Sequence, residues 1–270
     1  MTELDTFAES VAKNISEIGK DRDFIGLSNV WNREAIRYHY AHNFTWLGRP
    51  IIQVPQDTYA IQEIIWKVKP DLVIETGIAH GGSLILSASM LALLDYRDAV
   101  NSGQALNPHE SKRRVLGIDI DIRPHNRVAI EAHPLAHLIE MIEGSSVAPE
   151  VVEQVQAKAQ GNRNIVVFLD SNHTHEHVLA ELEAYAPLVS PDSYCVVWDT
   201  GVEDLPAGFV TDRPWGKGNN PKTAVFEYLK KLKEVSVKGS DGVRLNFEID
   251  KTIEHKIAIT ASSDGFLHRC

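Results

Sequence analysis

The chain has 270 residues, and its 27 Lys and Arg against 37 Asp and Glu give a formal net charge of −10. This acidic excess argues against a nucleic-acid binder or an anionic-membrane binder, because both need a basic face. A hydrophobic content of 43% excludes wholesale disorder, and only two cysteines, Cys195 and Cys270, exclude a disulfide scaffold. The N-terminus lacks the pattern of a signal peptide, and no apolar stretch reaches membrane-spanning length, so we expect a cytoplasmic protein without membrane insertion.

The first 48 residues contain several aromatic side chains, among them Trp31, Tyr40 and Phe44. We expect residues 1–48 to form a helical and aromatic cap and residues 49–270 to form the main domain. The aromatic side chains of such a cap would pack onto the core. The alternatives are that the cap walls a substrate pocket or makes an oligomer contact.

Short, continuous apolar runs predict strands that are buried on both faces, as in a parallel sheet. These runs are residues 71–75, 115–119, 138–142, 164–169 and 194–198. Segments with helical spacing lie between or before them, at residues 59–68, 84–94 and 178–185. Strands that alternate with helices indicate right-handed crossovers in a mostly parallel α/β sheet.

The end of the chain shows a different pattern. Residues 256–260 and 266–268 flank a turn at 262–265, which predicts a C-terminal antiparallel hairpin at one edge of the sheet. Residues 96–114 lack apolar periodicity, which predicts an irregular excursion from the fold, a loop between a helix and the second strand.

A Gly-rich turn follows the first predicted strand, over residues 75–83. Glycines there let the backbone approach a ligand closely, and the next helix offers free N–H groups at its start. Asp119 ends the second strand, where a carboxylate can accept both hydroxyls of a ribose, and Asp121 competes for this role. Gly144, Ser145 and Ser146 follow the third strand and could lie along an adenine edge.

Two further carboxylates, Asp170 and Asp199, follow the fourth and fifth strands. Because neighbouring strand ends lie about 5 Å apart, the two could converge and bind Mg²⁺, which relieves their repulsion. His173 could then act as general base toward a substrate hydroxyl. A zinc site at His173, His175 and His177 is the weaker alternative, since only the first and last would share a helix face and no paired cysteine is present.

With these features the chain resembles the cephalosporin hydroxylase / rhamnosyl O-methyltransferase family of class I S-adenosylmethionine-dependent methyltransferases. The residues that carry the resemblance are 73–83, 117–127, 168–173, 182–189 and 213–224. The resemblance implies a Rossmann-like seven-stranded sheet, S-adenosylmethionine as cofactor, and Mg²⁺ that acidifies an acceptor hydroxyl. The residues expected to hold the cofactor are Glu75, Thr76, Gly77, Ala79, Gly81, Ser83, Asp119, Ser145 and Asp170.

One position departs from the family pattern. Trp198 stands where relatives carry Glu, and an indole cannot bind a metal. Thr200 or water could therefore complete a metal site with Asp170 and Asp199, and the metal could be weak or absent. Asp170 and His173 are the residues expected to act in catalysis.

The acceptor expected is a small hydroxyl compound, such as a sugar, a glycoside or a secondary metabolite. Residues 201–222 could close over it, and Arg213, Lys217 and Lys222 in that loop hint at an anionic acceptor. A homo-oligomer is expected. Two other functions stay open: a non-catalytic S-adenosylmethionine-binding partner or scaffold, and a nucleotide-cofactor oxidoreductase or hydroxylase component.

Overall fold

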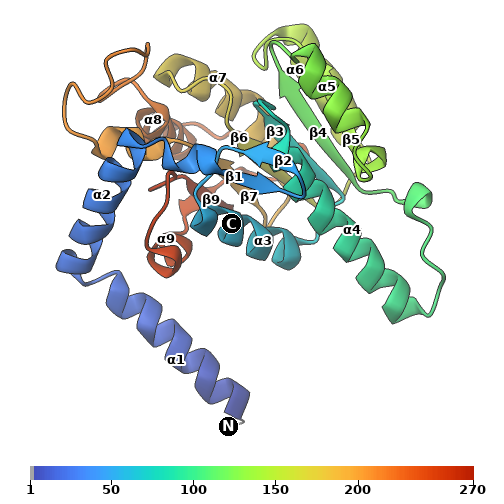
Figure 1. Ribbon diagram of the computed structural model, residues 1–270, viewed down its shortest axis with the longest axis horizontal. Coiled ribbons are helices and arrows are strands. Elements are labelled where there is room, and N and C mark those ends of the chain that lie inside the picture. The colour runs from blue at the N-terminus through green and yellow to red at the C-terminus, as the bar shows by residue number, and fades with distance from the viewer. Residues whose placement is uncertain (1–2) are drawn as a thin grey trace.

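The computed structural model describes residues 3–270. A seven-stranded sheet in the order β5-β4-β3-β6-β7-β9-β8 forms its centre (Figure 1). The first five strands in sequence are parallel, whereas β9 runs antiparallel to both β7 and β8. The strands are β3 (Leu72–Thr76), β4 (Arg114–Asp119), β5 (Ile139–Glu143), β6 (Ile165–Leu169), β7 (Tyr194–Val197), β8 (Phe247–Ile249) and β9 (Phe266–Arg269). The mostly parallel α/β fold with a C-terminal antiparallel pair is confirmed.

Helices cover both faces of this sheet, and the alternation of side chains along each strand feeds two cores. Along β3, Ile74 packs with one face and Val73 with the other. One core takes buried residues from α6 (Pro149–Ala159), α7 (His175–Tyr185) and α8 (Pro221–Glu234). The other takes them from α3 (Pro55–Val68), α4 (Gly82–Ser102) and α5 (Pro124–Glu131).

The N-terminal segment is built of α1 (Glu3–Ile18), α2 (Arg22–Arg37), the 3-10 turn η1 (Tyr40–Asn43) and an antiparallel pair, β1 (Phe44–Trp46) with β2 (Arg49–Ile51). Helix α1 projects from the body of the molecule (Figure 1). The boundary expected after residue 48 falls in the turn of the β1–β2 hairpin, where Leu47 and Gly48 have positive φ. The division into a cap and a main domain stays a prediction.

The cap aromatics pack edge to face, with ring centroids 5.0 Å apart for Trp31 and Tyr40 and 5.1 Å apart for Tyr40 and Phe44. Phe44 and Trp46 pack against the α3–α4 core, as expected of an aromatic cap. Trp31 and Tyr40 also line the cavity described below. The cap therefore both packs on the core and walls a pocket.

The prediction of a strand at residues 256–260, as the first strand of the C-terminal hairpin, is wrong. Residues 251–257 form α9 (Lys251–Ile257), and the antiparallel partner of β9 is β8, from an earlier segment. The Asp250 carboxylate accepts the N–H of Thr252 and starts the helix. Ile257, which belongs to the predicted strand, and Ile253, one helical turn before it, both pack against the core, so this segment presents one apolar helix face.

The predicted excursion at 96–114 is also shorter than expected. Helix α4 continues to Ser102 and ends at Gly103, which has a φ of 68°. The irregular part then contains the short 3-10 turn η2 (Pro108–Glu110) before β4. Tyr96 and Val100 are exposed on this last part of α4, which is why no apolar periodicity marks it.

Candidate functional site

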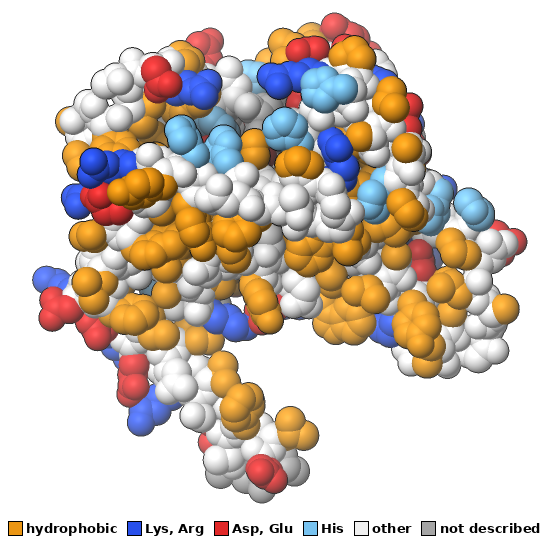
Figure 2. Space-filling model, viewed as in Figure 1, with side chains coloured by type: hydrophobic (Ala, Val, Ile, Leu, Met, Phe, Trp, Pro, Cys, Tyr) orange, Lys and Arg blue, Asp and Glu red, His pale blue; other side chains and the backbone are white. Residues whose placement is uncertain are grey.

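A cavity of about 740 Å³ lies at the carboxyl ends of the central strands. Its walls come from the Gly-rich turn after β3, from the residues that follow β6 and β7, from α2 and η1 of the cap, and from the loop between α9 and β9. Figure 2 shows histidine side chains gathered on the face that the cap hairpin occupies. His39, His42 and His80 all line the cavity.

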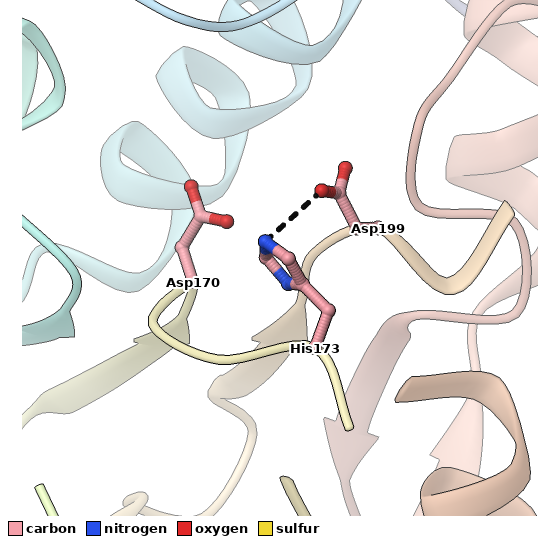
Figure 3. Close-up of side chains that lie close together, drawn as sticks. All are labelled: Asp170, His173 and Asp199. Carbon is pink, nitrogen blue, oxygen red and sulfur yellow. Dashed lines mark ion pairs between the residues drawn. The ribbon is translucent and has the colours of Figure 1, made fainter. Parts of the chain in front are cut away.

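Three side chains in this cavity form a cluster: Asp170, His173 and Asp199 (Figure 3). One potential ligand atom of each lies within 4.8 Å of those of the other two. His173 Nε2 lies 3.2 Å from Asp199 Oδ2. Among residues 3–270, this is the one group of three or more His, Cys, Asp or Glu residues close enough to hold a metal ion together.

Backbone contacts place the two carboxylates. The N–H of Asp170 donates to the carbonyl and to the hydroxyl of Thr76, at 2.9 and 3.2 Å, so the end of β6 is fixed against the end of β3. Asp199 has a φ of 55°, a left-handed conformation that is rare for a residue with a side chain. Trp215, from the loop before α8, packs edge-on against His173 with centroids 4.8 Å apart.

The surroundings of Asp170 disfavour its charged form. Removal from solvent raises the pKa of Asp170 well above its ordinary value, and the nearby carboxylates of Asp199 and Glu75 add to the rise. Two carboxylates are oxygen donors that a hard divalent cation such as Mg²⁺ would accept. The residues present therefore fit a metal held by Asp170 and Asp199, with His173 beside it.

The Gly-rich turn lies beside this cluster. Gly77 has a φ of 87°, and a Cβ added there would lie 2.0 Å from the Asp170 carbonyl, so only glycine allows the turn to meet the end of β6. Asp119 stabilises the turn, because its Oδ2 accepts the N–H groups of Ile78 and Ala79 at 2.8 and 3.2 Å. The turn then leads into the N-terminus of α4.

The structure brings only part of the expected cofactor set to the cavity wall. Gly77, Ala79, Ser83 and Asp170 line the cavity, and Gly81 is buried in the same turn. Glu75 is buried beneath it and accepts a hydrogen bond from the Ser83 hydroxyl.

The other members of that set lie elsewhere. Thr76 is fully buried and contacts Asp170 rather than the cavity. Ser145 is half-buried in the turn after β5, away from the cavity wall. The cofactor role of each residue stays a prediction.

Thr200 does not join the two carboxylates, which corrects the expectation of a hydroxyl ligand. Its side chain is fully buried and donates to the Ser263 carbonyl at 2.6 Å. His173 takes the third place in the cluster instead. Trp198 is also buried, and it packs against Phe266 with centroids 6.5 Å apart.

The positive charge expected for residues 201–222 is partly neutralised by ion pairs. The Lys222 ammonium is buried and bonds Asp204 and Asp264 at 2.7 and 3.0 Å, so it serves to tie loops together. The exposed Arg213 stacks over Trp215.

The three histidines of the zinc alternative separate. His175 contacts Thr223 and Glu227, and His177 contacts Ser146, Ser171 and Glu181. Their roles are packing and hydrogen bonding around α7, and only His173 faces the carboxylates.

Two further sets of residues contribute to the site, and the sequence does not predict them. Arg49 of β2 donates to the His80 carbonyl and to the Asn126 side chain, and Asn126 donates to the Ala79 carbonyl, so both hold the Gly-rich turn. Asp57 is fully buried and lines the cavity. No sequence signal marks either, because their partners lie far away along the chain.

A parallel sheet with a Gly-rich turn after its first strand, an acidic residue at the end of the second and a carboxylate cluster at the next two strand ends defines the class I methyltransferase architecture. Residues 38–270 match the family described as Rhamnosyl O-methyltransferase/CmcI. The chain therefore belongs to this family of S-adenosylmethionine-dependent methyltransferases, and the resemblance seen in the sequence is confirmed.

Curated relatives bear out this assignment. The chain is 29% identical over 243 residues to a rhamnosyl O-methyltransferase of Mycobacterium leprae, covering 87% of this chain and 90% of that protein. It is 28% identical over 249 residues to one of Mycobacterium bovis, covering 87% and 84%.

Solved structures of CmcI share the fold. An apo-structure matches with a TM-score of 0.52 and 17% identity, over 84% of this chain and 76% of that one. A structure of CmcI with Mg-SAM matches with a TM-score of 0.50 and 15% identity, over 85% and 77%. Among the helices of residues 3–270, none combines the length and apolar character that a membrane crossing requires.

Proposed function

We propose that the protein transfers the methyl group of S-adenosylmethionine to a hydroxyl of a sugar or glycoside, assisted by Mg²⁺. The observation that carries the proposal is the cluster of Asp170, His173 and Asp199, which shares one cavity with the Gly-rich turn. The names of the curated relatives support a glycosidic acceptor, because both are rhamnosyl O-methyltransferases.

The Gly-rich turn fits a nucleoside cofactor. Its glycines expose backbone at the start of α4, where the helix N-terminus attracts a carboxylate such as that of a methionyl group. We expect Asp119 to accept one ribose hydroxyl. Its oxygens already accept three N–H groups, but a carboxylate has about four lone-pair sites, so one remains.

The metal would be held by Asp170 and Asp199, with His173 beside them. A bound Mg²⁺ supplies a positive charge that lowers the pKa of a coordinated hydroxyl. The imidazole of His173 is oriented by Asp199 and by Trp215, and it is placed to accept the hydroxyl proton. The cap aromatics and the loop after β7 wall the cavity and limit the access of water.

The test combines cofactor binding with transfer. Calorimetry should show S-adenosylhomocysteine binding, and labelled S-adenosylmethionine should methylate methyl α-L-rhamnopyranoside or another glycoside in the presence of Mg²⁺. Asp199→Asn should abolish the Mg²⁺ dependence, whereas Asp121→Asn, an exposed strand-end control, should preserve it.

Other outcomes separate the alternatives. Binding without transfer to any sugar or phenolic acceptor would favour a scaffold protein. Tighter binding of NAD than of S-adenosylmethionine would favour an oxidoreductase. No binding of S-adenosylmethionine at millimolar concentration would refute the proposed function.

A further inference from the structure

Buried oxygens without partners gather at one end of the cavity. In residues 3–270, ten buried side-chain nitrogen or oxygen atoms lack a hydrogen-bond partner. Four of them belong to the start of α3 or to the loop between α9 and β9: those of Gln53, Gln56, Asp57 and Ser262. Gln53 and Asp57 also line the cavity, so a bound molecule can reach them.

Asp57 is the stronger of these two groups. Its side chain is 0% exposed, and Oδ2 accepts the N–H of Ala261 at 3.0 Å, whereas Oδ1 has no partner. Leaving a buried carboxylate oxygen unpaired costs about 1–3 kcal/mol or more. A hydrogen-bond donor from a ligand would remove this cost, and the 8% exposed amide of Gln53 presents a second acceptor near the same helix start.

The location of these groups indicates which ligand they meet. The Gly-rich turn follows β3, whereas the loop that contacts Asp57 leads into β9, on the far side of β6 and β7. The same loop binds the cap, since Asn32 donates to the Thr260 carbonyl at 3.1 Å. Burial is the main reason why the pKa of Asp57 is raised, and the charge of Asp199, at the end of β7, adds to the rise. This end of the cavity is therefore the acceptor side.

We propose that Gln53 and Asp57 form a subsite for the hydroxyl groups that neighbour the methylated hydroxyl, so that the acceptor is a polyol such as a pyranoside. The inference rests on the proposed function. Two oxygen acceptors select ligands that carry O–H donors, because an analogue that lacks one of these hydroxyls leaves its acceptor unpaired.

The experiment uses the full chain saturated with S-adenosylhomocysteine and titrated with methyl α-L-rhamnopyranoside and its monodeoxy analogues. Asp57→Ala should weaken glycoside binding about tenfold or more and leave S-adenosylhomocysteine affinity within about twofold. It should also erase the preference for the parent glycoside over one deoxy analogue, which is the readout that a merely structural role would not produce. Asp57→Asn should restore part of the affinity, and Gln53→Ala is the second variant if Asp57→Ala fails to fold.

Three results would overturn the subsite. The first is an equal loss of S-adenosylhomocysteine affinity, which would place the cofactor ammonium at Asp57. The second is unchanged glycoside affinity in both variants. The third is a wild-type complex that binds S-adenosylhomocysteine but none of the polyhydroxyl probes. Failure to bind S-adenosylhomocysteine at all would instead refute the proposed function.

Discussion

Single residues around the cavity hold unusual backbone conformations. Eight non-Gly residues among residues 3–270 have a positive φ, and four of them line the cavity: His39, Ala79, Asp199 and Ala258. Such conformations cost about 1–3 kcal/mol each and persist where surrounding contacts enforce them. At Asp199 the same residue combines this strained backbone conformation with a carboxylate that faces His173.

His173 should be needed for transfer but not for cofactor binding. We expect His173→Gln to lower the single-turnover methyl-transfer rate at least about a hundredfold, because the proton acceptor is lost. S-adenosylhomocysteine affinity should stay within about twofold, since the imidazole faces Asp199 rather than the Gly-rich turn. Rapid-quench kinetics and calorimetry measure the two quantities, and parallel losses in both would contradict the assignment of a base.

Glu75 should make stability depend on pH. Burial raises its pKa to about 7, and one of its oxygens lacks a partner. The folded state therefore binds the proton more tightly than the unfolded state does. This stabilising contribution is fully present below about pH 4.5 and is lost as the pH rises to about 7.

Glu75→Gln removes this titration. Relative to wild type, the free energy of unfolding of the variant should rise by about 2–3 kcal/mol between pH 5 and pH 8. Urea unfolding at both pH values measures it. The exposed Glu150→Gln should show no such change, and a pH-independent difference for Glu75→Gln would rule out a raised pKa.

At the scale of elements, the β1–β2 hairpin and the Gly-rich turn are joined. Arg49 donates Nε and Nη2 to the His80 carbonyl at 3.0 and 2.5 Å. Gly82 lets the hairpin approach α4, since a Cβ there would lie 2.2 Å from the Pro50 carbonyl. The cap hairpin therefore helps to set the shape of the Gly-rich turn.

Arg49→Ala should weaken S-adenosylhomocysteine binding about tenfold, because several hydrogen bonds to the turn and to Asn126 are lost. Arg49→Lys should restore little, since an ammonium cannot reproduce the planar fork. Calorimetry measures both. The matched control is Arg37→Ala, on the exposed surface of α2, and an equal effect there would show that general cap stability is responsible.

The sequence predicts well those elements whose own residues carry a clear apolar pattern. The parallel strands β3, β4, β6 and β7 are mostly apolar and buried, whereas the edge strand β5 is largely half-buried and contains Glu140. The sequence predicts all five to within about one residue. The edge strand Phe247–Ile249 has three residues and little buried surface, so the stronger alternation of residues 256–260 masked it. Asp170 and Asp199 could be paired from strand order alone, but the burial of Asp57 depends on Ala261, which is 204 positions away.

For the whole molecule, α1 is the feature that the rest of the chain leaves exposed. None of its residues is buried, and Leu4 and Phe7 are 79% and 67% exposed. A homo-oligomer stays a prediction, and this apolar face is where we expect another copy to pack. Light scattering should give a multiple of 30.1 kDa, and Leu4→Ser with Phe7→Ser should lower it. A mass of one chain for the wild type would contradict the prediction.

The contacts that close the cavity also dictate when it can form. Asn32 meets Thr260 across 228 positions, whereas β3, β4, β5 and β6 meet within the middle of the chain. During synthesis the Gly-rich turn can assemble while the ribosome still holds the C-terminal segment, but the wall around Asp57 must wait for the last residues to emerge. Because β9 pairs with both β7 and β8, a chain that stops before residue 258 would lack an interior strand of the sheet as well as the loop that contacts Asp57.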